Sequence, residues 1–162
     1  MVGTHHIAQL NIATALAPLD DPLLAEFMAK LDEINQLAER SPGYVWRLKS
    51  ESGNATDIHA MDNPRTIVNL TVWQSIEALF DFTYVSDHKA VMNRRREWFE
   101  KPSGPYMVLW WLPAGHVPGI EEAKARLEYL ARHGPSPTAF TFKVRFPSPA
   151  DMTARADEAF VC

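Results

Sequence analysis

The sequence has 162 residues, of which 46% are hydrophobic, and its formal charge is -4 at pH 7. This length suits one domain with a sizeable core, and the acidic balance without a long basic tract argues against nucleic acid as a partner. No apolar run approaches the ~20 residues of a membrane span, and the N-terminus lacks a signal-peptide pattern. We therefore expect a soluble cytoplasmic protein without a membrane partner. The single cysteine, Cys162, excludes an internal disulfide framework.

The first half of the chain alternates between strand and helix patterns. Residues 6–13 alternate apolar and polar side chains, which predicts a strand. Residues 23–40 have apolar side chains at helical spacing, and Asp20 or Asp21 can cap the helix that this spacing predicts. Two further stretches, 44–50 and 65–75, alternate again and predict the second and third strands.

The second half continues this order. Residues 76–84 and 86–102 predict helical stretches, 106–116 an aromatic-rich strand, 120–134 a third amphipathic helix and 139–147 a last strand. Residues 148–162 have no strong period and are expected to form a C-terminal tail. The order β-α-β-β-α-β, extended by α-β, predicts an α+β fold of ferredoxin-like type over residues 1–147, an antiparallel sheet with helices on one face.

The stretch 86–102 carries two unusual side chains. At about 100° per residue, its apolar side chains share one arc, and His88 and Arg95 lie at the centre of that arc. One interpretation is structural: Arg95 snorkels to solvent or pairs with a buried carboxylate, and His88 satisfies a backbone group. The other is a pocket, in which Arg95 holds an anionic oxygen and His88, whose pKa a helix N-terminus would lower, moves a proton. The apolar residues of this arc are Val91, Met92, Trp98 and Phe99.

The strands add further candidates. Asn is disfavoured in strands, so Asn11 and Asn69 need a reason to be there: a solvated or dimer-facing sheet surface, or a cavity that they line. Trp110 and Trp111 are adjacent in one strand and point to opposite faces, so one can belong to the core while the other meets a pocket or a partner. His116 follows that strand in a loop, where either a turn or a functional role suits it.

Six short stretches in order resemble one family. "AQLNIA", "VWQSIEAL", "HKAVMNRRREWF", "VLWWLPAGHVP", "EEAKARLEYL" and "HGPSPTAFTF" resemble the DUF3291 family, over about residues 6–146. That family is similar in fold to the dimeric α/β-barrel superfamily, which includes antibiotic-biosynthesis monooxygenases and haem enzymes. The resemblance implies a dimeric α/β-barrel fold and a homodimer formed through the sheet. It does not imply one reaction, because one fold hosts many.

These observations lead to one leading hypothesis and two alternatives. We expect a pocket between sheet and helices that binds and converts a small apolar or aromatic molecule, an anionic one suiting Arg95, by monooxygenase-like or isomerase/cyclase-like chemistry without an organic cofactor. The alternatives are a haem enzyme with His88 as axial ligand and a ligand-binding dimer without catalysis. We find no phosphate-binding loop and no metal-ligand spacing. The candidate catalytic residues are His88 and Arg95, and the candidate substrate-binding residues are Asn11, Asn69, Trp73, Met92, Trp98, Phe99, Trp111 and His116.

Overall fold

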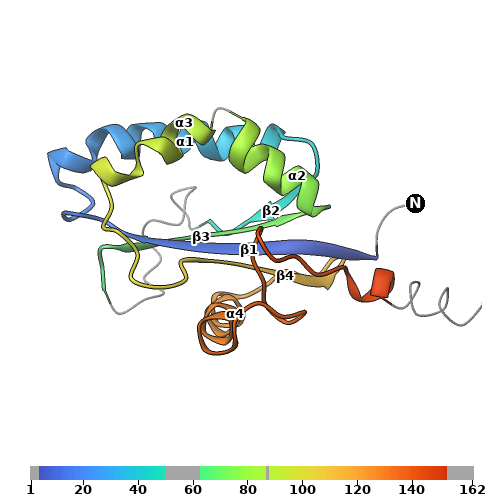
Figure 1. The fold of residues 1–162 in the computed structure, drawn as a ribbon. Helices are drawn as coiled ribbons and strands as arrows, with labels where there is room; N and C mark the ends of the chain where they lie inside the picture. The colour runs from blue at the N-terminus through green and yellow to red at the C-terminus, as the bar shows by residue number, and fades with distance from the viewer. Residues whose placement is uncertain (1–3, 50–62, 87, 153–162) are drawn as a thin grey trace, which may run out of the picture.

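The structure is a computed structural model that describes residues 4–49, 63–86 and 88–152. At its centre is a four-stranded antiparallel sheet in the order β2-β3-β1-β4 (Figure 1). The α+β fold and the first four strands predicted from the alternating patterns are confirmed. The strands are β1 (His5–Thr14), β2 (Tyr44–Arg47), β3 (Thr66–Trp73) and β4 (Met107–Pro113).

One face of the sheet is covered by two groups of helices (Figure 1). The first group begins with the short turn η1 (Pro22–Leu24), which Asp21 caps by accepting a hydrogen bond from the Leu23 N–H, and continues as α1 (Ala25–Arg40). In the second group, α2 (Ile76–Phe80), capped by Ser75, runs into the π-helical turn η2 (Asp81–Val85). The short elements α3 (His88–Asn93) and η3 (Arg95–Glu97) follow.

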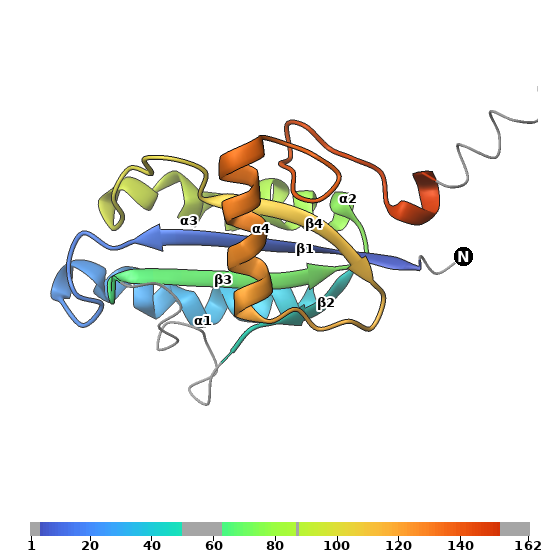
Figure 2. The same ribbon diagram turned by 90° about the horizontal axis from the view of Figure 1, so that it is seen from below.

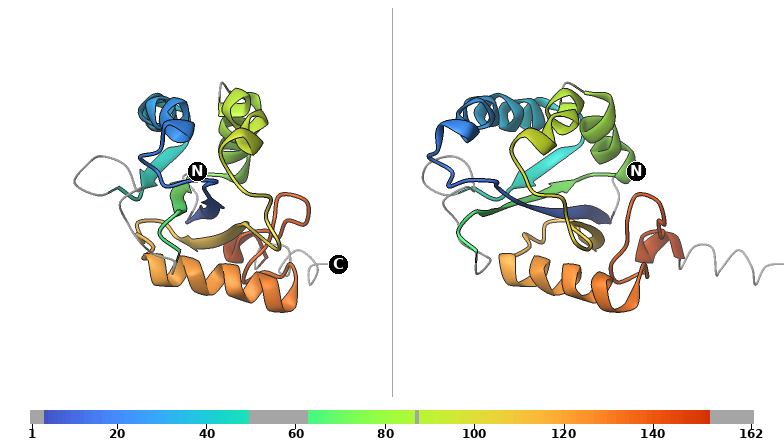
Figure 3. Two further views of the ribbon diagram at one scale, coloured as in Figure 1. Left: turned by 90° about the vertical axis from the view of Figure 1, so that its left-hand side faces the viewer. Right: turned by 60° about the vertical axis from the view of Figure 1, so that its left-hand side comes forward.

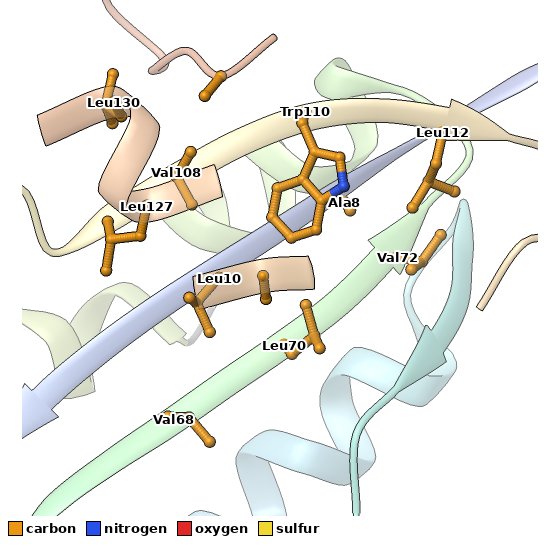
Figure 4. Packing of buried hydrophobic residues seen from close by; sticks show 12 residues of the cluster. Ala8, Leu10, Val68, Leu70, Val72, Val108, Trp110, Leu112, Leu127 and Leu130 are labelled. Atoms are coloured by element: carbon orange, nitrogen blue, oxygen red, sulfur yellow. The ribbon is translucent and has the colours of Figure 1, made fainter. Parts of the chain in front are cut away.

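The opposite face of the sheet is covered by α4 (Ile120–His133), which crosses the strands (Figure 2). Its buried residues Ala123, Leu127 and Leu130 pack on the apolar row of the sheet, and Figure 4 shows Leu127 and Leu130 beside that row. The strands contribute Ala8, Leu10, Val68, Leu70, Val72, Val108, Trp110 and Leu112. The first two predicted helical regions thus share one face, whereas the third covers the other.

Because α4 covers that face, the sheet surface through which we expected dimerisation is buried within the chain. A dimer built on it would have to displace Leu127 and Leu130, which are only 8% and 5% exposed. We therefore expect light scattering to give a mass near 18.3 kDa, that of one chain, at micromolar concentrations. A mass of two chains would require an interface elsewhere, at the strand edges or on the helices.

Two predicted elements differ from the structure. The predicted helix over 86–102 is broken: α3 ends at Asn93, and Arg94 adopts φ -98° and ψ 5° before the 3-10 turn begins. The predicted strand over 139–147 is wrong, because the chain there forms only two isolated bridges, between Leu109 and Phe140 and between Ser136 and Ala139. Phe140 is nevertheless fully buried. The apolar pattern of residues 139–147 therefore indicates packing against the sheet and not strand pairing.

The predicted boundary between domain and tail lies just before a helical stretch that the structure describes over residues 149–152. Ser148 is buried and accepts a hydrogen bond from the Asp151 N–H, while its hydroxyl donates to the Asp151 carboxylate. The chain is therefore still packed at residue 148, and the remainder of the predicted tail, 153–162, lies outside the described residues. None of the described helices is long and apolar enough to cross a bilayer.

Candidate functional site

A cavity of about 360 Å³ lies between the sheet and the helices on the face opposite α4. Figure 3 shows α1 and the α2–α3 region side by side over the same face of the sheet, and residues of both line the cavity. Polar side chains of β1 and β3 form the floor, and α1, η2, α3 and η3 form the walls and roof. The exposed lining residues Asn69, Arg95, Arg96 and Lys101 mark where the cavity opens to solvent.

The floor is a hydrogen-bonded row set by strand register. Gln9 pairs with Thr71 across the β1–β3 ladder, and Asn11 pairs with Asn69, so all four side chains point to the face that α1 and the α2–α3 region cover. Gln9 Nε2 donates to Asn69 Oδ1 at 2.5 Å and to Thr71 Oγ1 at 3.0 Å. Thr71 Oγ1 also accepts from Trp73 Nε1 at 2.9 Å. These cross-strand bonds fix where the polar groups of the floor lie.

His88 lines the cavity from the start of α3, which Ser86 caps by accepting the His88 N–H. Its Nδ1 lies 3.3 Å from the Thr83 carbonyl oxygen, and its ring lies 4.9 Å from the ring of Phe82. A carbonyl can only accept, so Nδ1 carries the hydrogen and Nε2 presents a lone pair. Nε2 has no hydrogen-bond partner among the described residues. His88 can therefore accept a proton from a molecule in the cavity.

Burial lowers the pKa of His88 below its ordinary value, an effect that the Thr83 carbonyl partly opposes. The sequence attributed a lowered pKa to the helix N-terminus, but α3 has only six residues and burial is the larger cause. A His with a lowered pKa in the folded state binds its proton first in the unfolded chain. Its contribution to stability is therefore complete above the unfolded pKa of about 6.5 and is lost as the pH falls from there toward the folded pKa.

We thus expect the melting temperature of the wild type to fall more steeply between about pH 7 and pH 5 than that of His88→Gln, which does not titrate there. Differential scanning calorimetry of both proteins across that interval measures the difference. Parallel curves would show that the His88 pKa is the same in the folded and unfolded states.

Arg95 lies on the same roof but is exposed, so its predicted burial is wrong. The reason is the break at Arg94, which turns Arg95 away from the arc of a continuous helix. Arg95 donates to the Tyr106 hydroxyl at 3.2 Å, and its guanidinium lies 5.7 Å from the centre of that ring. It forms no salt bridge with any described residue. The buried carboxylate partner of the structural interpretation is therefore absent from the described part of the chain.

Nearby carboxylates are engaged by Arg94 instead. Its guanidinium contacts both oxygens of Glu26 on α1, at 2.5 and 2.6 Å, and Glu97 at 2.7 Å. These contacts tie the roof to α1 and leave Arg95 without an anionic partner. Burial and, to a smaller extent, Tyr106 raise the pKa of Tyr84 beside this region, whereas the charge of Arg95 lowers it.

The cavity is rich in positive charge. Four lining cations form no salt bridge with any residue that the structure describes, and the one lining carboxylate is Glu100, which lies 3.6 Å from Arg65. A fifth cation, Arg47, pairs with Glu39 at 2.8 Å. In a chain of formal charge -4, this concentration favours an anionic ligand. The four cations without a salt bridge to a described residue are Lys30, Arg95, Arg96 and Lys101, of which Lys30 interacts electrostatically with Glu26.

The apolar wall comes from both helix groups. Phe27 on α1 packs against Trp98 at 5.5 Å and Phe99 at 4.8 Å between ring centres. Trp98 and Phe99 are 2% and 8% exposed, so they are shared between core and cavity. Met92, half-buried on α3, completes this wall. Flat rings on one side and amides on the other suit a planar molecule with polar substituents.

The structure does not bring every predicted site residue to the cavity. Trp73 is fully buried behind it, stacked on Phe82 at 5.0 Å. Trp111 donates to the Phe146 carbonyl oxygen at 2.8 Å and lines a separate hollow near Ser148. His116 is exposed beside α4, where its Nε2 lies 2.9 Å from Glu122. The predicted residues that do line the cavity are Asn11, Asn69, His88, Met92, Arg95, Trp98 and Phe99.

Sequence reasoning did not select several polar lining residues, among them Gln9, Thr71, Asn35 and Tyr106. Thr71 shares the polar face of its strand with Asn69, but Thr is common in strands, so nothing in the sequence marks it. Asn35 lies on the buried side of α1, where a polar residue in an apolar stripe is the signal that could have found it. Tyr106 precedes β4 and is brought to Arg95 by the fold alone.

The sequence matches the family described as "Domain of unknown function (DUF3291)" over residues 6–156, and the chain belongs to this family. The predicted resemblance is thereby confirmed. No curated protein matches the sequence. No group of three His, Cys, Asp or Glu side chains among the described residues could hold a metal ion.

Several solved structures are similar in part. One is a Nitrosomonas europaea protein provisionally described as an antibiotic biosynthesis monooxygenase, with 12% identity, a TM-score of 0.46, and coverage of 74% of this chain and 98% of that one. Another is SnoaB, a cofactor-independent oxygenase from Streptomyces nogalater, with 17% identity, a TM-score of 0.41, and coverage of 69% and 95%. At these sequence identities and TM-scores, the similarity supports no conclusion about activity.

Proposed function

We propose that this protein binds a planar, anionic small molecule in the cavity and removes a proton from it. The observation that carries this proposal is His88 Nε2, a proton acceptor without a partner among the described residues, in a cavity whose charged lining residues are mostly cations. Arg95 holds the anionic group, Trp98, Phe99 and Met92 contact the flat body, and His88 takes the proton. Removing a proton next to a carbonyl gives an enolate, which is the shared first step of cofactor-free oxygenation and of isomerisation.

A 2-tetralone carboxylate tests this proposal, because its methylene group between the aromatic ring and the carbonyl is acidic. In D₂O, we expect the wild type to accelerate exchange of these protons above the buffer rate, measured by NMR. An oxygen electrode then separates the two chemistries: oxygen uptake that accompanies exchange indicates a monooxygenase, and exchange without uptake indicates an isomerase or cyclase. Binding without exchange would favour the non-catalytic alternative, and absence of both would refute the proposal.

Haem is supported less well. His88 offers one imidazole nitrogen, but a porphyrin under it would place an apolar face, which accepts no hydrogen bond, against the polar floor of Gln9, Asn69 and Thr71. We expect hemin added to the purified protein to give no sharp Soret band. A band that is present in the wild type and lost in His88→Ala would reverse this ranking.

A further inference from the structure

The hydroxyl group of Thr71 lines the cavity, and its hydrogen is not donated to any described residue. Both acceptor positions of Thr71 Oγ1 are occupied, by Gln9 Nε2 at 3.0 Å and by Trp73 Nε1 at 2.9 Å. An indole N–H can only donate, so its direction is certain. A hydroxyl has two lone pairs and one hydrogen, and only the hydrogen of Thr71 is left to use.

Gln9 cannot accept that hydrogen, because the atom that it presents to Thr71 is its amide nitrogen, which can only donate. Its Nε2 lies 2.5 Å from Asn69 Oδ1 and 3.4 Å from the Asn69 backbone oxygen, and the latter can only accept. The amide of Gln9 must therefore present its nitrogen to Asn69 and Thr71. No hydrogen bond within the described residues uses the Thr71 hydrogen as donor.

A second polar group, the side-chain amide of Asn35, also lines the cavity. Asn35 projects from α1, lines the cavity and makes no side-chain hydrogen bond with a described residue. Thr71 is 4% exposed and Asn35 is 8% exposed, so little of either side chain faces bulk water, although neither polar atom of the Asn35 amide is both fully buried and unpaired. Buried polar groups are almost always hydrogen-bonded, because leaving them unpaired is costly. Behind them, Leu79 and Phe82 pack around Trp73 and close the inner end of the cavity.

We infer that the inner end of the cavity recognises a carbonyl oxygen of the ligand, with the Thr71 hydroxyl and the Asn35 amide as hydrogen-bond donors. The ligand class is then a flat aromatic or apolar ketone with an anionic group at its other end, beside Arg95. This inference rests on the proposed function, since it takes the same cavity and the same anionic group. Thr71 becomes the residue that sets specificity between a ketone and its hydrocarbon counterpart.

A matched pair of probes tests the inference: a biphenyl carboxylate, and the same molecule with an acetyl group at the far end of its second ring. Affinities are measured by quenching of tryptophan fluorescence. We expect the wild type to bind the acetyl compound at least about tenfold more tightly, as a buried hydrogen bond of about 1.4 kcal/mol would give. Thr71→Val should remove this preference, and Thr71→Ser, which keeps the hydroxyl, should retain it.

The ratio of the two affinities within each variant controls for general changes in the cavity. A measurement on the wild type alone covers the case in which Thr71→Val fails to fold. With carbon-13 in the acetyl carbonyl, infrared difference spectra should show its stretching band at lower frequency in the complex than in an apolar solvent.

The outcomes separate the two proposals. If both probes bind equally well, or the carbonyl band is unshifted, the inference about Thr71 is overturned and the proposed anionic ligand stands. A preference that survives in Thr71→Val also overturns it. If neither probe binds the wild type, the proposed function fails, and the inference fails with it.

Discussion

Replacing His88 by glutamine is expected to lower the protein-catalysed rate of deuterium exchange in a 2-tetralone carboxylate by about 100- to 10,000-fold, the usual contribution of a general base. Glutamine keeps a polar side chain near the Thr83 carbonyl, but it cannot accept a proton near neutral pH. The comparison is made by NMR under saturating probe, so that a change in affinity does not enter the rate.

The matched control is His116→Gln. This variant also removes an imidazole, but from a site outside the cavity. His116 is exposed beside α4, and its Nε2 lies 2.9 Å from Glu122. We expect this variant to exchange protons at the wild-type rate. If His88→Gln exchanges as fast as the wild type, His88 is not the base, and only the binding part of the proposed function survives.

The rate should also follow the protonation of His88. Burial lowers its pKa, so the imidazole is neutral and competent at pH 7, and the exchange rate should decline only when the pH falls below the ordinary pKa of a histidine, about 6.5. The stability of the folded chain declines in the same direction. The two effects are separated by measuring exchange at a temperature well below the melting transition at each pH.

The floor of the cavity was predictable because strand alternation is a strong constraint. Once residues 6–13 and 65–75 are strands, Asn11 and Asn69 must share the face of Gln9 and Thr71. What alternation could not tell was which face the helices cover. The sequence of α4 shows an amphipathic helix, but its placement depends on the loop that carries the chain past Pro113 to the far side of the sheet. The homodimer through the sheet was predicted without knowing that α4 covers that face of the sheet.

The roof was less predictable because helix periodicity assumes a continuous helix. No glycine or proline marks the break between Asn93 and Arg95, so the sequence indicated a single helix over 86–102. The break leaves His88 half-buried, as the arc predicted, and turns Arg95 outward. Arg94, which the arc did not select, makes the strong contacts with Glu26 and Glu97. Competition among three adjacent arginines for two carboxylates is decided by tertiary geometry and not by sequence spacing.

Arg95→Met is expected to separate the two interpretations of Arg95. It should weaken binding of the biphenyl carboxylate by about 10- to 100-fold, because a hydrogen bond to a charged group contributes about 1.5–3 kcal/mol. The free energy of unfolding should change by less than about 0.5 kcal/mol, as for other exposed side chains. The only side-chain hydrogen bond lost within the described residues is the one to the Tyr106 hydroxyl, and no described carboxylate is left unpaired.

The control for this variant is Arg132→Met, which removes an exposed cation from the last turn of α4 on the opposite face of the sheet. It makes the same change in net charge, so a general electrostatic effect on anion binding would appear in both variants. We expect wild-type affinity from Arg132→Met at moderate salt, where charges far from the cavity are screened. Equal affinities in the wild type and Arg95→Met would remove Arg95 from the site. A large fall in melting temperature for Arg95→Met would instead support its structural role, because it would reveal a carboxylate partner that the described residues do not include.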